Sequence, residues 1–277
     1  MRRGKIVREF PAPLGLRLEL TGDASDVVLL GTSEPKVQVV IHYRIPAWGT
    51  LAEEWEKALS RRPPLEFKDN VLRIGPEPEG IELDYEIILP NESAVEIRLG
   101  SGDISVQNFS GKLSVTTGSG DFWAQKLSGE FRLQTGSGDI NLSQAFGAFT
   151  LRTGSGDVDG EEVKGSMDLE TGSGDIELAD FLGDLRLRTG SGDVEVKGEI
   201  LEETWEIRTG SGDVFLALPK DSEMEVVLRS EFGDIACDFP LQAQGFCEGL
   251  VQGRVGASPK AKIHVVAEAG DIVLRSR

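Results

Sequence analysis

The chain has 277 residues, and its 29 basic against 47 acidic side chains give a formal net charge of −18. This length suffices for one large domain or two small ones with a buried core. The charge excludes general nucleic-acid binding, which needs a basic footprint on the phosphates. No apolar run approaches the roughly 18 residues of a membrane span, and two cysteines cannot make a disulfide scaffold.

The first residues are basic, like the start of an export signal, but Pro11 and Pro13 interrupt the apolar stretch that such a signal needs. We therefore expect a cytoplasmic protein without a signal peptide or membrane anchor, which membrane partners could recruit. Cys237 and Cys247 fit either free thiols, as in a reducing compartment, or one bridge.

Residues 1–99 contain short runs in which apolar and polar residues alternate, which is the pattern of half-buried strands. We interpret this region as irregular coils of the kind that follow in regular form from residue 100. The clearest runs cover residues 16–20, 37–43, 81–89 and 95–99.

One helix is predicted near residues 51–61. Thr50 and Glu53 form a capping box at its start, and Pro63 with Pro64 ends it. Because the end strand of a sheet is an open edge, we expect this helix to cap the fold or pack on its side. A partner-binding helix is the alternative.

From residue 100 the tetrapeptide Gly-Ser-Gly-Asp occurs seven times, and successive copies are 18 residues apart except for a last gap of 20. Two degraded copies end at Asp234 and Asp271. Apolar residues alternate after each aspartate and again after a second glycine, so that each unit holds two short strands. The seven aspartates are Asp103, Asp121, Asp139, Asp157, Asp175, Asp193 and Asp213.

A unit of 18 residues cannot bury its own apolar face, but stacked units can, with like strands paired in parallel. The sequence therefore predicts an all-β parallel β-solenoid, a single-stranded β-helix or β-roll, with a right-handed coil as the expected hand. We divide it into irregular coils at 1–99 and regular coils at 100–277, with an inserted loop or hairpin at 238–262. The predicted inward columns are Ile104, Phe122, Ile140, Val158, Ile176, Val194 and Val214, and Leu113, Phe131, Phe149, Met167 and Leu185.

The run 82–90 followed by 95–104 resembles the entry into the bacterial "putative adhesin" domain family of unknown function, also called Toastrack. That family repeats Thr-Gly-Ser-Gly-Asp-Ile/Val, and in one copy of this chain Phe122 takes the Ile/Val place. The resemblance implies a parallel β-solenoid without an established catalytic activity, and many members belong to cell-envelope or membrane-stress systems. The motif begins at Thr117, Thr135, Thr153, Thr171, Thr189 and Thr209.

In register, the aspartates stack one per coil. Two bare charges about 4.8 Å apart repel by about 1 kcal/mol even at the dielectric constant of water, so something should offset the repulsion. We predict that the carboxylates accept turn amide hydrogens and that no metal or other cofactor is bound. A calcium ladder along the seven aspartates is the alternative, since oxygen-rich acidic turns suit Ca²⁺.

The motif threonines point inward by parity, which predicts internal hydroxyl ladders rather than an outward ligand array. Trp123 and Phe215 fall at outward positions, and with Trp55 of the predicted helix they are the candidate partner contacts. Packing under a loop is the alternative for both outward aromatics.

Catalytic signals are nearly absent. His42 and His264 are the only histidines, and neither accompanies a nucleophile motif. We therefore predict no catalytic residues and a non-catalytic scaffold or protein-interaction module, which the resemblance connects with a cell-envelope stress or surface system. The alternative is an adhesin-like module that binds glycans or surfaces with calcium, and a carbohydrate-active β-helix enzyme comes last. A protein partner is expected, nucleic acid and a direct membrane span are not, and self-association stays open.

Overall fold

The computed structural model describes residues 1–46, 49–247 and 249–277, with the backbone alone for 243–247. The chain divides into two compact units, Met1–Gly136 and Ser137–Arg277. Both units are β-solenoids, which confirms the predicted fold class, and the division at residues 99 and 100 stays a prediction. Within the described part of the chain, no helix is long and apolar enough to cross a membrane.

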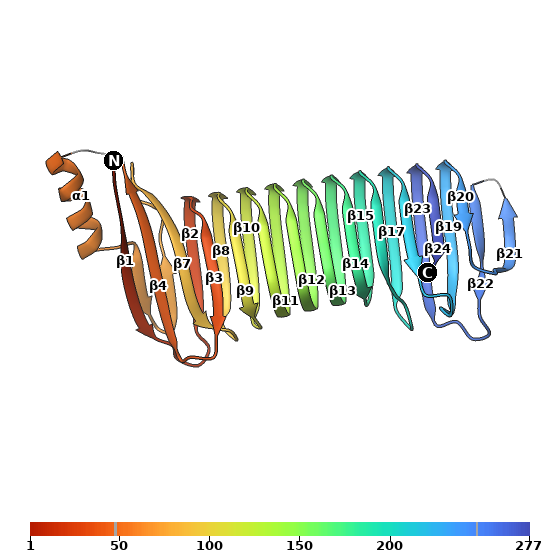
Figure 1. Ribbon diagram of the computed structural model, residues 1–277, viewed down its shortest axis with the longest axis horizontal. Coiled ribbons are helices and arrows are strands. Elements are labelled where there is room, and N and C mark those ends of the chain that lie inside the picture. Colours follow the sequence, from red (N-terminus) through yellow and green to blue (C-terminus); the bar gives the residue numbers. More distant parts are fainter. Residues whose placement is uncertain (47–48, 248) are drawn as a thin grey trace. The chain divides into compact units, whose positions relative to one another are not determined.

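Unit 1 consists of two rows of strands (Figure 1). Their inward apolar side chains are buried and form its core. We call the row β5–β6–β2–β8–β10 face A and the row β1–β4–β7–β3–β9–β11 face B. The elements are β1(Arg2–Pro11), β2(Arg17–Ala24), β3(Val27–Thr32), β4(Lys36–Ile45), α1(Gly49–Arg61), β5(Leu65–Lys68), β6(Val71–Ile74), β7(Glu82–Pro90), β8(Ala94–Ser101), β9(Ile104–Phe109), β10(Lys112–Ser119) and β11(Phe122–Ser137).

The coils of unit 1 do not stack in chain order. β2 pairs in parallel with β6 on one side and with β8 on the other, and β3 lies in the same way between β7 and β9. The first coil of the chain, formed by β2 and β3, therefore lies inside the stack. The strands at the end are antiparallel, because β4 pairs with β7 and with β1. The strand predicted at 37–43 is present as β4, but its assignment to a parallel coil is wrong, because β4 runs antiparallel to both of its neighbours.

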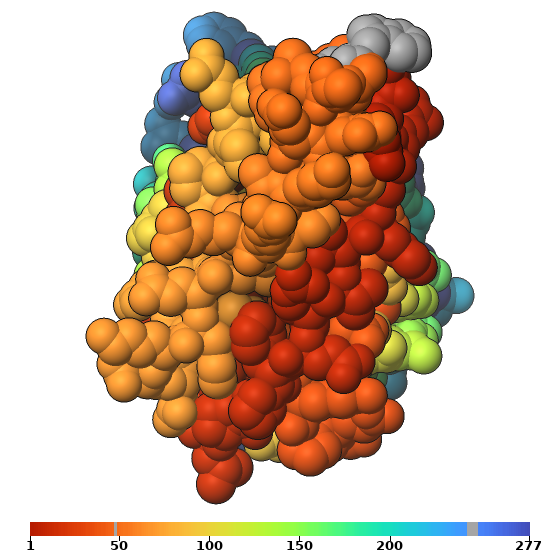
Figure 2. All heavy atoms as spheres, turned by 90° about the vertical axis from the view of Figure 1, so that its left-hand side faces the viewer, coloured from red at the N-terminus to blue at the C-terminus, as the bar shows by residue number. Residues whose placement is uncertain are grey.

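Helix α1 lies beside β1 on one part of the end face of unit 1, where β1 is also at the surface (Figure 2). The helix begins two residues before the predicted range and ends with it, at Arg61. Its side chains Ala52 and Leu59 are buried and Trp55 is half-buried, whereas Leu51 and Ala58 are exposed. The hydroxyl of Tyr43 donates to the Glu56 carboxylate, and the Arg8 guanidinium donates to the carbonyl of Ser60 at 2.6 Å. These contacts fix α1 on β4 and β1 and support the capping interpretation.

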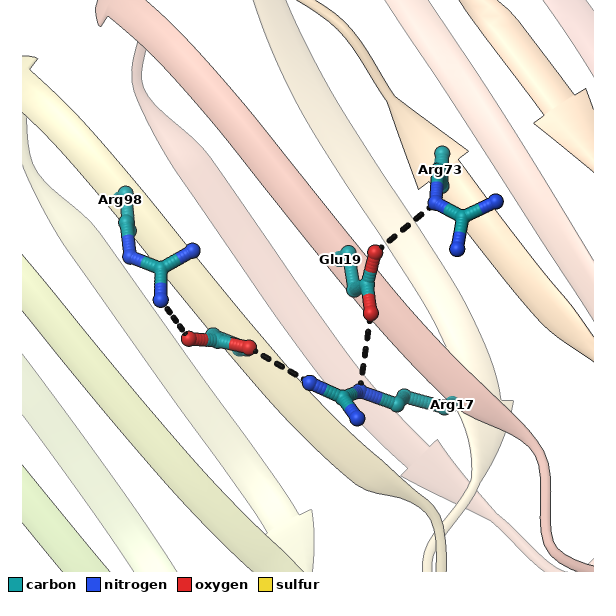
Figure 3. Close-up of polar contacts among 5 residues, drawn as sticks. Arg17, Glu19, Arg73 and Arg98 are labelled. Atoms are coloured by element: carbon teal, nitrogen blue, oxygen red, sulfur yellow. Dashed lines mark hydrogen bonds and ion pairs between the residues drawn. The ribbon is translucent and has the colours of Figure 1, made fainter.

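A chain of ion pairs crosses face A where the displaced coil is inserted (Figure 3). Glu19 on β2 contacts Arg73 of β6 at 2.9 Å and Arg17 at 3.0 Å. Arg17 also contacts Glu96 of β8 at 2.8 Å, and Glu96 pairs with Arg98. Exposed pairs are individually weak, but this network ties β2 to both of its neighbours.

Unit 2 repeats the architecture. Its face A is the row β12–β13–β15–β17–β23–β19–β22–β21, and its face B is the row β12–β13–β14–β16–β18–β24–β20, since the long strands β12 and β13 bend across both. The elements are β12(Ile140–Ser155), β13(Val158–Ser173), β14(Ile176–Leu182), β15(Leu185–Ser191), β16(Val194–Glu199), β17(Thr204–Ser211), β18(Val214–Leu218), β19(Met224–Phe232), β20(Ile235–Cys237), β21(Gln242–Cys247), β22(Leu250–Val255), β23(Ala261–Ala269) and β24(Ile272–Ser276).

Unit 2 also ends with a displaced coil. β23 lies between β17 and β19, and β24 lies between β18 and β20, so the last coil of the chain is again an inner coil. The predicted insertion at 238–262 contains the antiparallel hairpin of β21 and β22, and β22 pairs with β19. Cys237 carries a free, half-buried thiol, whereas the Cys247 side chain lies outside the described residues.

Both predicted inward columns are buried, with every member at most 4 % exposed. A third buried column, which the alternation did not predict, lies between them at the second corner of the coil. Just before it, a non-glycine residue such as Asn108 (φ 55°) takes a left-handed conformation and turns the chain, so that Val106 and Phe109 both point inward. The third column consists of Phe109, Leu127, Ala145, Val163 and Phe181.

Candidate functional site

The repeat aspartates form a ladder along one edge of the coils in each unit. Along the ladder, the Oδ1 atom of one aspartate accepts the main-chain N–H of the aspartate in the neighbouring coil. The N–O distances are 3.2 Å for Asp84 to Asp26, 3.0 Å for Asp26 to Asp103 and 3.0 Å for Asp103 to Asp121 in unit 1. In unit 2 they are 2.9 Å from Asp139 to Asp157 and 2.8 Å for the steps through Asp175, Asp193, Asp213, Asp271 and Asp234.

The carboxylates thus accept turn amide hydrogens, and the donor belongs to the next coil rather than to the same turn. Asp26 and Asp84 extend the ladder into the N-terminal region, and sequence reasoning missed them because neither follows a Gly-Ser-Gly. Among the described residues, no group of three or more His, Cys, Asp or Glu side chains is placed to hold a metal ion. The calcium ladder remains untested.

The other residues of the motif also serve coil stacking. Thr171 is buried, as parity predicts, and its hydroxyl donates to the carbonyl of Ser173 at 3.2 Å. The same carbonyl accepts the amide of Gly156 in the preceding coil at 3.1 Å. Gly174 has φ +135°, and a Cβ atom there would lie 2.2 Å from the carbonyl oxygen of Gly156. Glycine and aspartate of the motif therefore join one coil to the next, and threonine holds the turn whose carbonyl accepts the amide of the neighbouring coil.

The three candidate contact residues lie on different elements. Trp123 is 41 % exposed on face B of unit 1, where β11 places it beside Ser105 of β9. Trp55 of α1 is half-buried, and its ring lies 3.4 Å from where a Cβ atom on Gly80 would be. Phe215 on β18 of unit 2 is half-buried. Their role as partner contacts stays a prediction.

Face B of unit 1 carries further outward apolar side chains that sequence reasoning missed. Val28 is 37 % exposed, and Leu30 and Ile88 are half-buried at outward positions. The sequence feature that could have revealed them is the unbroken apolar run Val27–Leu30. Successive side chains of a strand point to opposite faces, so in a run of four apolar residues two must point outward.

The histidines take no part in a catalytic arrangement among the described residues. His42 lies exposed on β4, with its Nε2 atom 3.9 Å from a Glu86 carboxylate oxygen. His264 lies half-buried on β23. Within the described part of the chain, neither has a hydrogen bond to a serine or cysteine that could act as a nucleophile.

These features define a class of acidic, parallel β-solenoid proteins whose repeat motif joins successive coils. The family model described as Toastrack DUF4097 matches residues 91–146 and 128–275. The chain therefore belongs to the Toastrack family, as the motif predicts. No protein of curated function has a sequence that matches it.

Solved structures of low similarity span the whole chain. A putative adhesin from Bacteroides fragilis is 11% identical with a TM-score of 0.38, and the match covers 98% of this chain and 97% of that one. A putative cell adhesion protein from Clostridium sporogenes is 13% identical with a TM-score of 0.29, and the match covers 100% of both chains.

Proposed function

We propose that this protein is a non-catalytic scaffold that binds protein partners through the outward faces of its coils. One observation carries the proposal: the threonine, glycine and aspartate of the motif serve the turn and the stacking of the coils, so function falls to the outward side chains, which differ from coil to coil. Membership of the Toastrack family fits a non-enzymatic surface or interaction module.

We further propose a cytoplasmic location, with recruitment to the envelope through partners. Fractionation of the producing bacterium tests it. Recovery in the soluble fraction supports the location, and recovery in an outer-surface fraction that protease reaches in intact cells contradicts it.

The partner is tested by crosslinking in living cells, followed by affinity purification of the full chain and mass spectrometry. The proposal expects one or a few proteins that co-purify in fixed proportion and bind again when both are purified. If no purified candidate binds, the scaffold function is wrong.

A second candidate function is an adhesin-like module that binds glycans or surfaces. The exposed ring of Trp123 next to Ser105 favours it, because an aromatic face with neighbouring hydroxyls suits a sugar. A glycan array with calcium and with a chelator tests this function. Calcium-dependent glycan binding would also support calcium binding by the aspartate ladder. Turnover of acidic polysaccharides would instead indicate an enzyme.

A further inference from the structure

Face B of unit 1 carries an exposed apolar patch, which we define as Val28, Leu30, Ile88 and Trp123. The strand register places these side chains on one face: Leu30 pairs with Ile88 across β3 and β7. Val28 pairs with Glu86 of β7 on one side and with Ser105 of β9 on the other, and Ser105 pairs in turn with Trp123 of β11. Val28 is 37 % and Trp123 is 41 % exposed. No other described element of unit 1 covers these two side chains.

The patch has a shallow centre and a defined span. Val28 and Trp123 are two strands apart, or about 10 Å at the usual strand spacing, and only the small side chain of Ser105 stands between them. Gln107 of β9 and Gln125 of β11 pair in register beside this row and present neutral polar groups.

A row of carboxylates borders the patch on one side. Asp26 precedes Val28 by two residues, and Asp103 precedes Ser105 by two residues, so each lies about 7 Å along the chain from the row that joins Val28 to Trp123. Both are exposed. One carboxylate oxygen of each accepts a neighbouring main-chain amide. This hydrogen bond fixes the position of the carboxylate, which keeps its negative charge. Asp84 of the same row is paired with Arg44 at 2.9 Å.

We propose that the apolar patch and its aspartate border bind a basic amphipathic helix of a protein partner. This inference rests on the proposed scaffold function and assigns its site. Charge complementarity decides the occupant: the carboxylates of Asp26 and Asp103 along one side of the patch, and of Glu86 beside Val28, match a helix whose apolar stripe is flanked by cations.

The dimensions of a helix fit this surface. A helix lying across the strands rises about 5.4 Å per turn, close to the roughly 4.8 Å between strands. Apolar residues at i and i+7 are about 10.5 Å apart, which matches Val28 and Trp123. Lysines or arginines three or four residues apart then meet Asp26 and Asp103, which lie on adjacent strands.

The first test uses a synthetic amphipathic peptide with leucines at i, i+3, i+4 and i+7 and lysines along one flank, measured by fluorescence anisotropy with the full chain. Trp123→Ala should raise the dissociation constant about tenfold, as loss of a large aromatic contact at an interface does. Phe146→Ala is the matched control, because Phe146 is 43 % exposed and belongs to unit 2. It should leave binding unchanged.

The second test removes charge without removing the ladder. Asp26→Asn with Asp103→Asn keeps an oxygen that accepts the neighbouring amide, so the fold should persist. It should weaken peptide binding about tenfold in dilute salt and flatten its salt dependence. Asp175→Asn with Asp193→Asn in unit 2 is the matched control, because it removes two charges from the same kind of ladder, and it should change neither.

Equal effects of Trp123→Ala and Phe146→Ala, or equal binding of a peptide with the same composition in scrambled order, would overturn the site. Trp123-dependent binding of a neutral glycan, with no peptide binding, would overturn the helix in favour of a sugar. The scaffold function is judged separately. A purified partner that binds Trp123→Ala as tightly as the unaltered chain leaves the scaffold in place and removes only this site.

Discussion

The carboxylate of Asp157 accepts the main-chain amide of Asp175, 18 residues further on, at 2.8 Å. The bond runs from one coil to the next, and its repetition fixes the register of the stack at the motif edge. The aspartate position, which repeats most regularly in the sequence, thus stabilises the fold by a contact between coils, and this contact accounts for its period.

The ladder predicts opposite results for two substitutions of Asp175. Asp175→Asn keeps an oxygen for the amide of Asp193 and removes one charge from a column of like charges, so the free energy of unfolding should not fall. Asp175→Ala removes the acceptor and should lower it by about 1 kcal/mol. Urea titration measures both, with the exposed carboxylate variant Glu161→Ala as the control. Equal losses in the asparagine and alanine variants would contradict the ladder.

Gly174→Ala should be among the most damaging single changes. The added Cβ atom would lie 2.2 Å from the carbonyl oxygen of Gly156, at a residue with φ +135°. We expect a loss of about 3 kcal/mol or failure to fold. Gly75→Ala is the control, because its nearest neighbour would lie 4.0 Å away, and it should be nearly neutral. Thermal unfolding compares the two, and a similar melting temperature would disprove the close approach of the coils.

Tyr43 makes the end of unit 1 sensitive to alkaline pH. Burial first, and then its hydrogen bond to Glu56, raise the pKa of Tyr43 to about 12. In the unfolded chain the phenol ionises near pH 10. Because the folded pKa is the higher one, this contribution to stability is complete below about pH 10 and is lost as the pH rises towards 12. Tyr43→Phe should weaken this pH dependence of unfolding, whereas an unchanged slope would exclude Tyr43 as its source.

Tyr85 should respond differently from Tyr43 to the same substitution. Its hydroxyl is buried and has no hydrogen-bond partner among the described residues, and burial raises the pKa of its phenol. Removing an unpaired buried hydroxyl removes a desolvation cost, so Tyr85→Phe should be neutral or stabilise the fold by up to about 1 kcal/mol. Tyr43→Phe loses a real bond and should cost about 1 kcal/mol. Chemical unfolding near neutral pH distinguishes them, and a clear loss for Tyr85→Phe would show that its hydroxyl has a partner.

The sequence predicted the site less completely than the fold. The aspartates of the motif could be placed on one edge because their spacing is constant. The apolar patch could not, because Val28 is hidden in an apolar run and Ile88 lies 60 residues further along the chain. Only the pairing of β3 with β7 brings Val28 and Ile88 onto one face.

The period of the coil, its two alternating columns and the inward threonines were determined by the sequence alone, since side-chain parity and glycine spacing are local properties of the chain. The order of the coils was decided by the tertiary structure. β2 and β3 lie inside one unit, and β23 and β24 inside the other, although each pair stands near a chain terminus. The physical reason is that parallel coils offer equivalent edges, and an alternating strand does not specify which neighbour it will pair with. The neighbours are specified by contacts that exist only in the folded chain. These are the antiparallel end strands, ion pairs such as Arg17 with Glu96, and the packing of α1.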